Sequence, residues 1–348
     1  MIRAGIIGAS GYGGGELVRI LAAHPQVELT YLSSETYKGR DIGDALPNMR
    51  GFLCMECEGY APDKAIERCD VLFFAQHNGW AMNEAARYLD AGLKIVDLGA
   101  DFRLRDAEAY REWYKLEHTS PHLIEEAVYG LPELYREQIR DARLIANPGC
   151  YVTSTLLALA PVMKAYVIDP ETIIIDAMSG FSGVGRSKFA LQNHFPEVNE
   201  SARAYGVASH RHTPEIEQEL SVLAGAPVMV SFTPHVIPIT RGILATVYGS
   251  IVGRGFSTKE FIQVYREFYN DSPFVQVMDE GEYPTTKSVA GSNYCRIAVK
   301  VDERTNRIVI ISAIDNLIKG MSGQAVQNMN LMYGLDERTG IVLPGMYP

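Results

Sequence analysis

Residues 4–21 read AGIIGASGYGGGELVRIL, with a glycine-rich run between two apolar runs. The apolar run Ala4–Ile7 predicts a strand, the glycines after it predict a tight turn, and the next apolar residues predict a helix over about Gly14–Ala23. Glycines let the backbone of such a turn approach a pyrophosphate, and a helix N-terminus favours the same anion. We therefore expect a dinucleotide-binding strand, turn and helix at this point.

The glycine spacing departs from the usual fingerprint. It is Gly8-x-x-Gly11-x-x-Gly14 and not G-x-G-x-x-G, so the position after a strand and the density of glycines support the prediction more than the pattern itself does. A plain strand-to-helix turn is the alternative interpretation.

The second predicted strand, Glu28–Ser33, ends where an NAD enzyme usually offers an acid to the ribose 2′-hydroxyl, about 20 residues after the glycine turn. This strand ends in hydroxyls, because Ser34 follows Ser33 there. Both can donate to a 2′-phosphate, and Lys38 and Arg40 follow closely. Although Glu35 argues the other way, we expect NADP(H) as the cofactor.

The remaining pattern predicts two domains. Strands and helices alternate through the first 150 residues and indicate a parallel sheet covered by helices. After about residue 160, β-rich segments with few helices between them indicate a mostly antiparallel sheet. We expect a Rossmann-type NADP-binding domain over residues 1–150, a substrate-binding and oligomerisation domain over 151–315, and a C-terminal part over 316–348 whose helix returns to the first domain. The further predicted strands are Val71–Ala75, Lys94–Leu98, Leu144–Ala146, Thr172–Ala177, Val228–Pro234, Gly242–Ile251, Tyr294–Val301 and Arg307–Ile314.

Composition narrows the class of protein. A chain of 348 residues with 47% apolar residues exceeds the usual length of one domain. A formal net charge of −10 opposes a nucleic-acid or membrane partner, since both recruit basic surfaces. No signal peptide or long apolar segment is apparent, so we expect a cytoplasmic protein. The five cysteines are expected to be reduced thiols, and the Cys54–Cys57 pair lacks the further ligands of a zinc site, so no metal is expected.

Cys150 is the predicted nucleophile. It follows a strand and the turn Asn147-Pro148-Gly149, and it opens a helix of small and apolar residues. Unpaired N–H groups at a helix N-terminus favour thiolate over thiol and can hydrogen-bond a developing oxyanion. This setting is typical of covalent catalysis. The alternative, a buried thiol that fills space, suits Cys69 and Cys295 better.

A proton carrier is expected just before another helix. Thr213 is a good N-cap and Pro214 a good first helical residue, so His210 and His212 fall in an extended segment before them. Alternation then places both histidines on one side of the chain and Arg211 on the other. Histidine is the natural proton carrier at neutral pH. We rank His212 first and His210 second as the base, with two solvated loop histidines as the alternative.

On these motifs the chain resembles the N-acetyl-gamma-glutamyl-phosphate reductase family, which is related to aspartate-semialdehyde dehydrogenases and more distantly to glyceraldehyde-3-phosphate dehydrogenase. Gly99, Met321 and Ser322 are mild departures. The segments that carry the resemblance are residues 8–14, 98–103, 129–133, 147–151, 179–186, 210–216 and 319–328.

The resemblance implies a function. It implies that NADPH reduces the acyl phosphate N-acetyl-L-glutamyl 5-phosphate to N-acetyl-L-glutamate 5-semialdehyde in arginine biosynthesis, with release of inorganic phosphate. The chemistry would pass through a thioester on Cys150 in a homodimer or homotetramer. One alternative is the carrier-protein-linked aminoadipyl or glutamyl phosphate reductase of lysine or ornithine biosynthesis. A second, of another class, is a non-catalytic NADP-binding regulator.

The resemblance also assigns site residues. It makes Cys150 the nucleophile and His212 the base. For the cofactor it nominates Gly8, Ser10, Gly11, Tyr12 and Gly13 in the glycine turn, with Asn316 and Gln324 on the nicotinamide side.

The substrate would need local cations, because its phosphate and α-carboxylate are both anionic while the chain is acidic overall. Arginines and N–H groups of a glycine-rich turn are the usual partners of such anions. The candidates for substrate binding are Arg103, Arg186, Lys188 and Arg211, with a possible anion-binding turn at Ser179, Ser182, Gly183 and Gly185.

Overall fold

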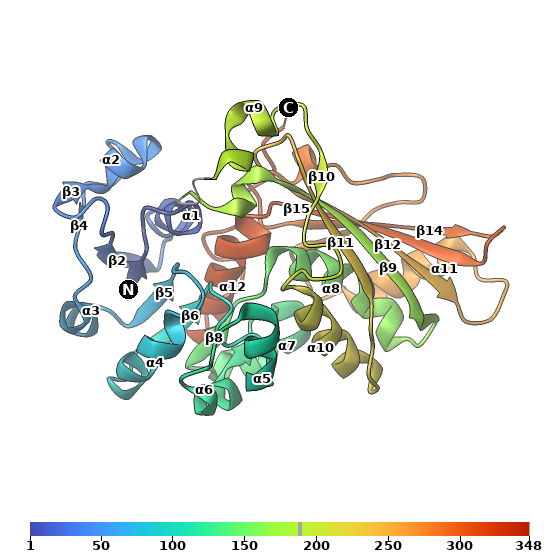
Figure 1. Ribbon diagram of the computed structural model, residues 1–348, viewed down its shortest axis with the longest axis horizontal. Helices are drawn as coiled ribbons and strands as arrows, with labels where there is room; N and C mark the ends of the chain where they lie inside the picture. The colour runs from blue at the N-terminus through green and yellow to red at the C-terminus, as the bar shows by residue number, and fades with distance from the viewer. Residues whose placement is uncertain (187–189, 348) are drawn as a thin grey trace. The chain divides into compact units, whose positions relative to one another are not determined.

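The computed structural model describes residues 1–186 and 190–347, which divide into two units (Figure 1). The first unit holds Met1–Pro148, Gly185 with Arg186, and Met321–Val342. The second holds Gly149–Val184, the described residues from 190 to Gly320, and 343–347. The chain therefore returns to the first unit at Met321 and not at residue 316, because the 315–320 turn packs within the second unit.

The first unit is built on a six-stranded sheet in the order β2-β1-β5-β6-β8-β7, and every pair in it is parallel. Parallel strands buried on both faces are nearly continuous apolar runs, as in β5, where all four residues are buried. This confirms the predicted Rossmann-type domain. The strands are β1 (Ile2–Ile7), β2 (Val27–Ser33), β5 (Val71–Phe74), β6 (Lys94–Asp97), β7 (Val128–Tyr129) and β8 (Leu144–Ala146), with β3 (Arg40–Asp41) paired to β4 (Glu56–Cys57) outside this sheet.

Helices connect these parallel strands. Glycines begin the first of them, and Pro62, Pro121 and Pro132 stand at the first turns of three others, where a missing N–H costs nothing. The helices are α1 (Tyr12–Leu21), α2 (Ile42–Ala45), α3 (Pro62–Arg68), α4 (Ala81–Asp90), α5 (Ala107–Ala109), α6 (Pro121–Glu126) and α7 (Pro132–Asp141).

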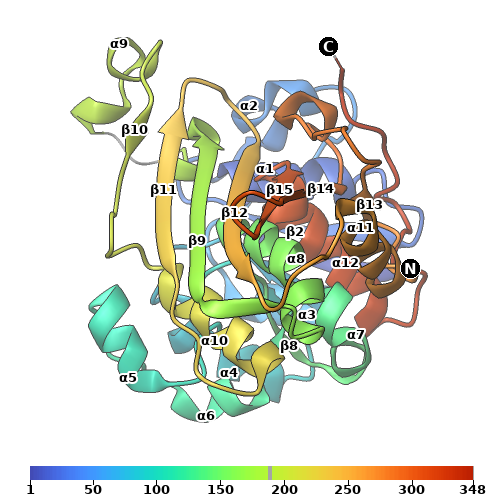
Figure 2. The same ribbon diagram turned by 90° about the vertical axis from the view of Figure 1, so that its right-hand side faces the viewer.

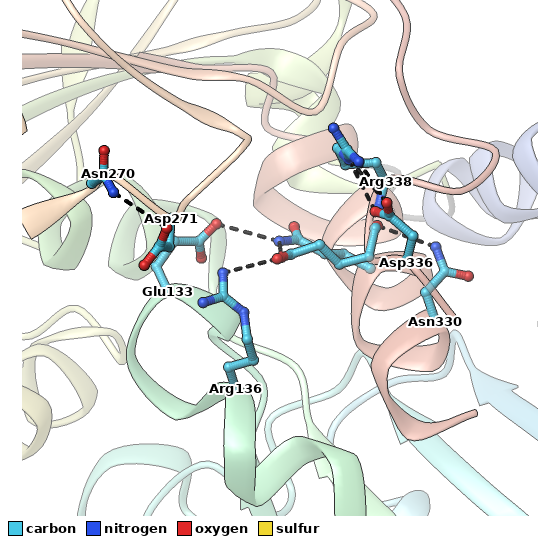
Figure 3. Close-up of polar contacts among 9 residues, drawn as sticks. Glu133, Arg136, Asn270, Asp271, Asn330, Asp336 and Arg338 are labelled. Atoms are coloured by element: carbon cyan, nitrogen blue, oxygen red, sulfur yellow. Dashed lines mark hydrogen bonds and ion pairs between the residues drawn. The ribbon is translucent and has the colours of Figure 1, made fainter. Parts of the chain in front are cut away.

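Helix α12 (Gly323–Met332) belongs to the first unit, and every one of its residues is buried. Most of its polar side chains have hydrogen-bond partners within the unit. The Asn330 amide donates to the carbonyls of Glu337 and Thr339. Arg136 of α7 forms an ion pair with the Glu337 carboxylate at 2.8 Å. Arg136 and Asn330 are labelled in Figure 3. A helix polar on several sides is therefore tolerated in the interior, because its polar groups meet partners there.

The second unit is built on a seven-stranded sheet in the order β10-β11-β9-β12-β15-β14-β13. The β11–β9 and β14–β13 pairs are parallel and the other four are antiparallel, so the prediction of a mostly antiparallel sheet is confirmed. The strands are β9 (Ile168–Gly180), β10 (Arg203–Ala204), β11 (Ser231–Ile237), β12 (Ile243–Ile251), β13 (Val275–Val277), β14 (Cys295–Asp302) and β15 (Arg307–Ile314).

One face of this second sheet carries exposed apolar residues. Along β9, buried Ile173, Ile175 and Ala177 alternate with Ile174 and Met178, which are 41% and 42% exposed. Figure 2 looks onto this region, and no helix lies over most of the length of β11, β9 and β12 there. Apolar side chains left open on a sheet face indicate an interaction surface.

The opposite face packs on α8 (Cys150–Lys164), whose residues from Tyr151 to Met163 are all buried. Pro161 lies inside this helix and cannot donate to the Leu157 carbonyl four residues earlier. The Tyr269 hydroxyl donates to that carbonyl instead, at 2.6 Å. A buried carbonyl orphaned by proline is thus satisfied from a neighbouring segment.

Three more helices belong to this unit: α9 (Phe195–Val198), α10 (Thr213–Ala224) and α11 (Thr258–Phe268). We did not predict α11, although the sequence at its start contains a typical helix N-terminal motif. Ser257 and Glu260 form a complete capping box there, in which each side chain accepts from the other residue's backbone N–H. No helix in the described part of the chain is long and apolar enough to cross a membrane.

Candidate active site

The glycine turn of the first unit has the shape of a dinucleotide loop. Gly8 has a φ of +96°, and a Cβ atom added to it would lie 2.4 Å from the Ala75 carbonyl oxygen. A Cβ atom at Gly14 would lie 2.1 Å from the Gly8 carbonyl oxygen. Only glycine fits at either position, since backbone cannot move aside for a side chain. These residues therefore fit a pyrophosphate-binding turn by their own geometry.

Helix α1 begins directly after this turn, with Gly11 as its N-cap. The N–H groups of Gly8 and Ala9 both donate to the Ser33 carbonyl, which fastens the turn to the end of β2. The first N–H groups of α1 have no partner within the helix and remain available to an anion. At Gly13 the neighbour is a flexible side chain, since a Cβ atom there would lie 2.4 Å from Cε of Met321.

The two serines at the end of β2 are buried. Ser33 is 2% exposed and Ser34 is 3% exposed. The Ser34 hydroxyl lies 2.7 Å from that of Ser10 and accepts from the Tyr37 N–H. These serines therefore brace the loop more than they offer hydroxyls to a ligand. The acid that argued for NAD is also engaged, since the Glu35 carboxylate accepts from the Tyr60 N–H at 2.7 Å.

Two arginines gather at the exposed edge of this region, around Tyr37. The guanidinium carbons of Arg40 and Arg186 lie 5.3 and 5.7 Å from the centre of the Tyr37 ring. Arg40 also forms an ion pair with Asp44 at 3.0 Å. Arg186, expected to bind substrate, donates instead to the Ser10 carbonyl of the glycine turn at 2.9 Å.

In the second unit, Cys150 is the first residue of α8, as predicted, and Gly149 is its N-cap. Cys150 is partly exposed and forms no disulfide. Two glycines allow a close approach at this point. A Cβ atom at Gly149 would lie 2.5 Å from His212 Nε2, and one at Gly320 would lie 2.8 Å from Cys150 Cβ. The His212 ring therefore rests against the residue that precedes the nucleophile.

The two histidines are neighbours, but not through an extended segment. Residues 210–212 form a turn in which the His212 N–H donates to His210 Nδ1 at 3.1 Å, and the ring centres are 4.8 Å apart. Helix α10 begins at Thr213 with His212 as N-cap, one residue earlier than predicted. Burial, reinforced by the positive charge of Arg211, lowers the pKa of His210 to about 4. His210 is therefore neutral at neutral pH and a poor proton acceptor.

Glu215 is a site residue that sequence reasoning missed. It lies in the first turn of α10, is fully buried, and accepts from the Gly149 N–H at 3.0 Å. The bond ties the start of α10 to the N-cap of α8, so it fixes the histidine turn relative to Cys150. Its position three residues after His212 was visible in the sequence, but its partner is 66 residues away.

Two tyrosines line the same region. The Tyr205 hydroxyl donates to that of Tyr151 at 3.2 Å, and Tyr151 donates to the His235 carbonyl. Burial raises the pKa of Tyr205 to about 12, and the negative charge of Cys150 adds to the rise. Burial and the neighbouring Tyr205 likewise raise the pKa of Tyr151, so both stay protonated.

The predicted anion-binding turn lies at the end of β9. The Asn316 amide donates to the Ser182 hydroxyl at 2.9 Å, and Asn316 Oδ1 accepts from the Gly242 N–H. Ser179 Oγ would be 3.4 Å from a Cβ atom at Gly183. Asn316 is therefore brought together with Ser179, Ser182 and Gly183 within this unit.

A cation missed by sequence reasoning lies beside this turn. Arg241 is 22% exposed and pairs at 3.2 Å with Asp315, which is fully buried. The Gly180 N–H donates to the Gly242 carbonyl, which places Arg241 next to the end of β9. The Asp315 carboxylate also accepts from the Gly291 N–H, and this second bond fixes the position of the ion pair.

Other predicted residues have structural partners. Arg103 is 8% exposed and donates to the carbonyls of Asn147 and Leu98, so it braces the turn before Pro148. Gln324 is fully buried and donates to the Gly130 carbonyl, a contact that favours a structural role. Arg211 is exposed, and Lys188 lies outside the described residues.

Comparison with known proteins gives consistent matches. Residues 3–142 match the semialdehyde dehydrogenase NAD binding domain, and residues 150–316 match the semialdehyde dehydrogenase dimerisation domain. N-acetyl-gamma-glutamyl-phosphate reductases are 52% identical in Desulforamulus reducens and 53% identical in Moorella thermoacetica, over all 348 residues and the whole of each relative.

Among solved structures, aspartate semialdehyde dehydrogenase II from Vibrio cholerae, complexed with ASA, has a TM-score of 0.74 at 17% identity, covering 96% of this chain and 98% of that one. Aspartate semialdehyde dehydrogenase with NADP from Candida albicans has a TM-score of 0.71 at 15% identity, over 96% and 98%. At such identities these structures share the fold with this chain.

Proposed function

The chain belongs to the family of N-acetyl-gamma-glutamyl-phosphate reductases, and on that premise we propose that it reduces N-acetyl-L-glutamyl 5-phosphate to N-acetyl-L-glutamate 5-semialdehyde with NADPH. The observation that carries the proposal is the arrangement at the start of α8. Cys150 stands at the helix N-terminus, and the residue before it is held by Glu215 and contacted by His212. This arrangement suits acyl transfer to sulfur.

In the first step the Cys150 thiolate attacks the acyl carbon. A carbon–sulfur bond forms, the bond from that carbon to the phosphate oxygen breaks, and phosphate leaves with the electron pair. The unpaired N–H groups in the first turn of α8 can stabilise the oxyanion that develops on the acyl oxygen. The product of this step is a thioester on Cys150.

In the second step the thioester is reduced and released. The glycine turn would hold NADPH, and the cofactor would supply a hydride to the thioester carbon. His212 donates a proton to the resulting hemithioacetal oxygen and takes it back as the carbon–sulfur bond breaks. Aldehyde and Cys150 thiolate result. We assign this proton transfer to His212 because it contacts Gly149 and because His210 is held neutral.

The substrate is tested by running the reaction in reverse. With N-acetyl-L-glutamate 5-semialdehyde, NADP and inorganic phosphate, the purified protein should form NADPH continuously. Aspartate semialdehyde and glyceraldehyde 3-phosphate should be poor replacements, since both lack the acetamido group and would leave polar groups of the pocket unpaired. A carrier-protein-linked semialdehyde should also be poor, because its acyl group continues into a protein. Faster turnover of any of these than of the acetylated compound would contradict the proposed substrate.

We also propose a cytoplasmic homodimer or homotetramer. The matched dimerisation domain spans the second unit's sheet, where Ile174 and Met178 leave an open apolar face on β9. None of the five cysteines is in a disulfide, which is usual for proteins of a reducing compartment. Light scattering of the purified protein tests the assembly, and a monomer at working concentration would contradict it.

A further inference from the structure

The structure places Arg186 at the cofactor loop, although its sequence position suggested substrate. Its Nη1 donates to the carbonyls of Ser10 and Ala45, each at 2.9 Å. Its Nη2 donates to the Tyr37 hydroxyl at 3.2 Å, and its guanidinium lies over the Tyr37 ring. All of these groups belong to the first unit, to which Arg186 itself is assigned.

The position of Tyr37 defines which part of a dinucleotide would lie here. Its N–H donates to the hydroxyl of Ser34, which directly follows the last residue of β2. In Rossmann-type domains the ribose 2′-substituent lies at the end of the second strand. The Tyr37 ring and its two arginines therefore stand at the 2′ position and not at the nicotinamide.

The two arginines differ in whether a carboxylate neutralises their charge. Arg40 pairs with the Asp44 carboxylate, which also receives Arg50 at 3.3 Å. Arg186 is exposed, and its hydrogen bonds to described residues end on neutral oxygens, two carbonyls and one phenol. Among the described residues it has no carboxylate partner, so it is an uncompensated cation beside the loop.

The serines and the acid at the end of β2 are not placed to bind a 2′-phosphate. The Ser33 and Ser34 hydroxyls are buried, and the Glu35 carboxylate is engaged by the Tyr60 N–H. A guanidinium presents a planar fork of donors that matches phosphate oxygens and can bind two at once. Stacking on Tyr37 pre-orients that fork.

We propose that Arg186 is a specificity-determining residue that binds the 2′-phosphate of NADP(H), with Arg40 in support. The inference deepens the proposed function and rests on its cofactor, not on its substrate. It also replaces the earlier expectation that Arg186 binds the acyl phosphate.

The competing explanation is that Arg186 is only a structural brace between its own segment and the glycine turn. Direct binding separates the two. Isothermal titration of Arg186→Met with NADP, NAD and 2′,5′-ADP should raise the Kd for NADP and 2′,5′-ADP by about 10- to 100-fold, the cost of a lost charged hydrogen bond. The Kd for NAD should change less than about threefold, and Arg186→Lys should recover part of the loss because it keeps the charge.

Arg203→Met is the matched control. Arg203 also stacks on an aromatic ring, that of Phe181 at 5.7 Å, and also donates to a carbonyl, but it lies in the second unit. It should leave the binding of all three ligands unchanged. Equal weakening of NADP and NAD by Arg186→Met would establish the brace and overturn the proposal, as would unchanged NADP binding.

Failure of this inference is distinguishable from failure of the proposed function. The titrations need no acyl substrate, so a wrong substrate would leave the Arg186 result intact. If Arg186 proves to be a brace, wild-type protein would still turn over N-acetyl-L-glutamate 5-semialdehyde with NADP and phosphate.

Discussion

Gly149 directly precedes the nucleophile Cys150 and lies against the ring of the proposed base, His212. Its φ of −66° is open to any residue, so steric contact with His212 is what requires glycine there. Gly149→Ala should push the imidazole aside and lower kcat by about 10²–10⁴, the usual effect of losing a general acid–base. NADPH titration should give an unchanged Kd, because the glycine turn is untouched.

Gly249→Ala serves as its control. A Cβ atom at Gly249 on β12 would meet Ile168 at 3.4 Å, an ordinary contact, so kcat should stay near that of wild type. A Gly149→Ala enzyme as fast as Gly249→Ala would show that the position of His212 against Gly149 does not matter for turnover.

His210 makes a prediction about pH. Its pKa is lowered to about 4 in the folded protein, mainly by burial, against an ordinary value near 6.5 when unfolded. Between those pH values the unfolded chain binds more protons than the folded protein, so the free energy of unfolding falls as the pH drops from 6.5 towards 4. Above pH 6.5 the contribution of His210 to the free energy of unfolding is fully present.

From pH 7 to pH 5 this loss amounts to about 2 kcal/mol for one such group. His210→Gln should remove it, and urea unfolding at the two pH values measures the difference. If the variant lost as much free energy of unfolding as wild type over that range, His210 would not be the buried neutral group described here.

Among the elements, α8 contains Pro161 and depends on the Tyr269 hydroxyl for the hydrogen bond that this proline cannot make. Tyr269→Phe should leave the Leu157 carbonyl buried without a donor, because Pro161 has no N–H to give. An unsatisfied buried carbonyl costs about 1–3 kcal/mol. Urea unfolding of Tyr269→Phe should show this loss, whereas Tyr283→Phe, at a residue 51% exposed, should show almost none. Equal stability of the two variants would mean that the Leu157 carbonyl finds another partner.

Elements were predictable from sequence where a local pattern decides them. β15 was predicted over its full range, Arg307–Ile314, because its apolar alternation and flanking turn are local. β9 extends well beyond the predicted 172–177, because pairing with β12 and β11 lengthens it. The turn at residues 210–212 was read as extended, since the bond from the His212 N–H to His210 Nδ1 is invisible in a pattern.

At the scale of the whole chain, sequence predicted the two units and the start of α8, because glycine turns and apolar periodicity specify them. It could not predict partners that lie far along the chain. The contact of Arg186 with Ser10 joins residues 176 positions apart, and Arg241 meets Asp315 across 74. The residues next to either arginine in the sequence do not indicate these partners, which are brought close only by the fold.

The proposed reaction passes through a thioester on Cys150, which can be trapped when phosphate is left out. Protein mixed with N-acetyl-L-glutamate 5-semialdehyde and NADP without phosphate should form at most one NADPH per active site, since phosphate is needed to cleave the thioester. Mass spectrometry of the quenched protein should find one N-acetylglutamyl group on Cys150, and added phosphate should remove it. Sustained NADPH formation without phosphate, or an acyl group on any residue other than Cys150, would contradict the account.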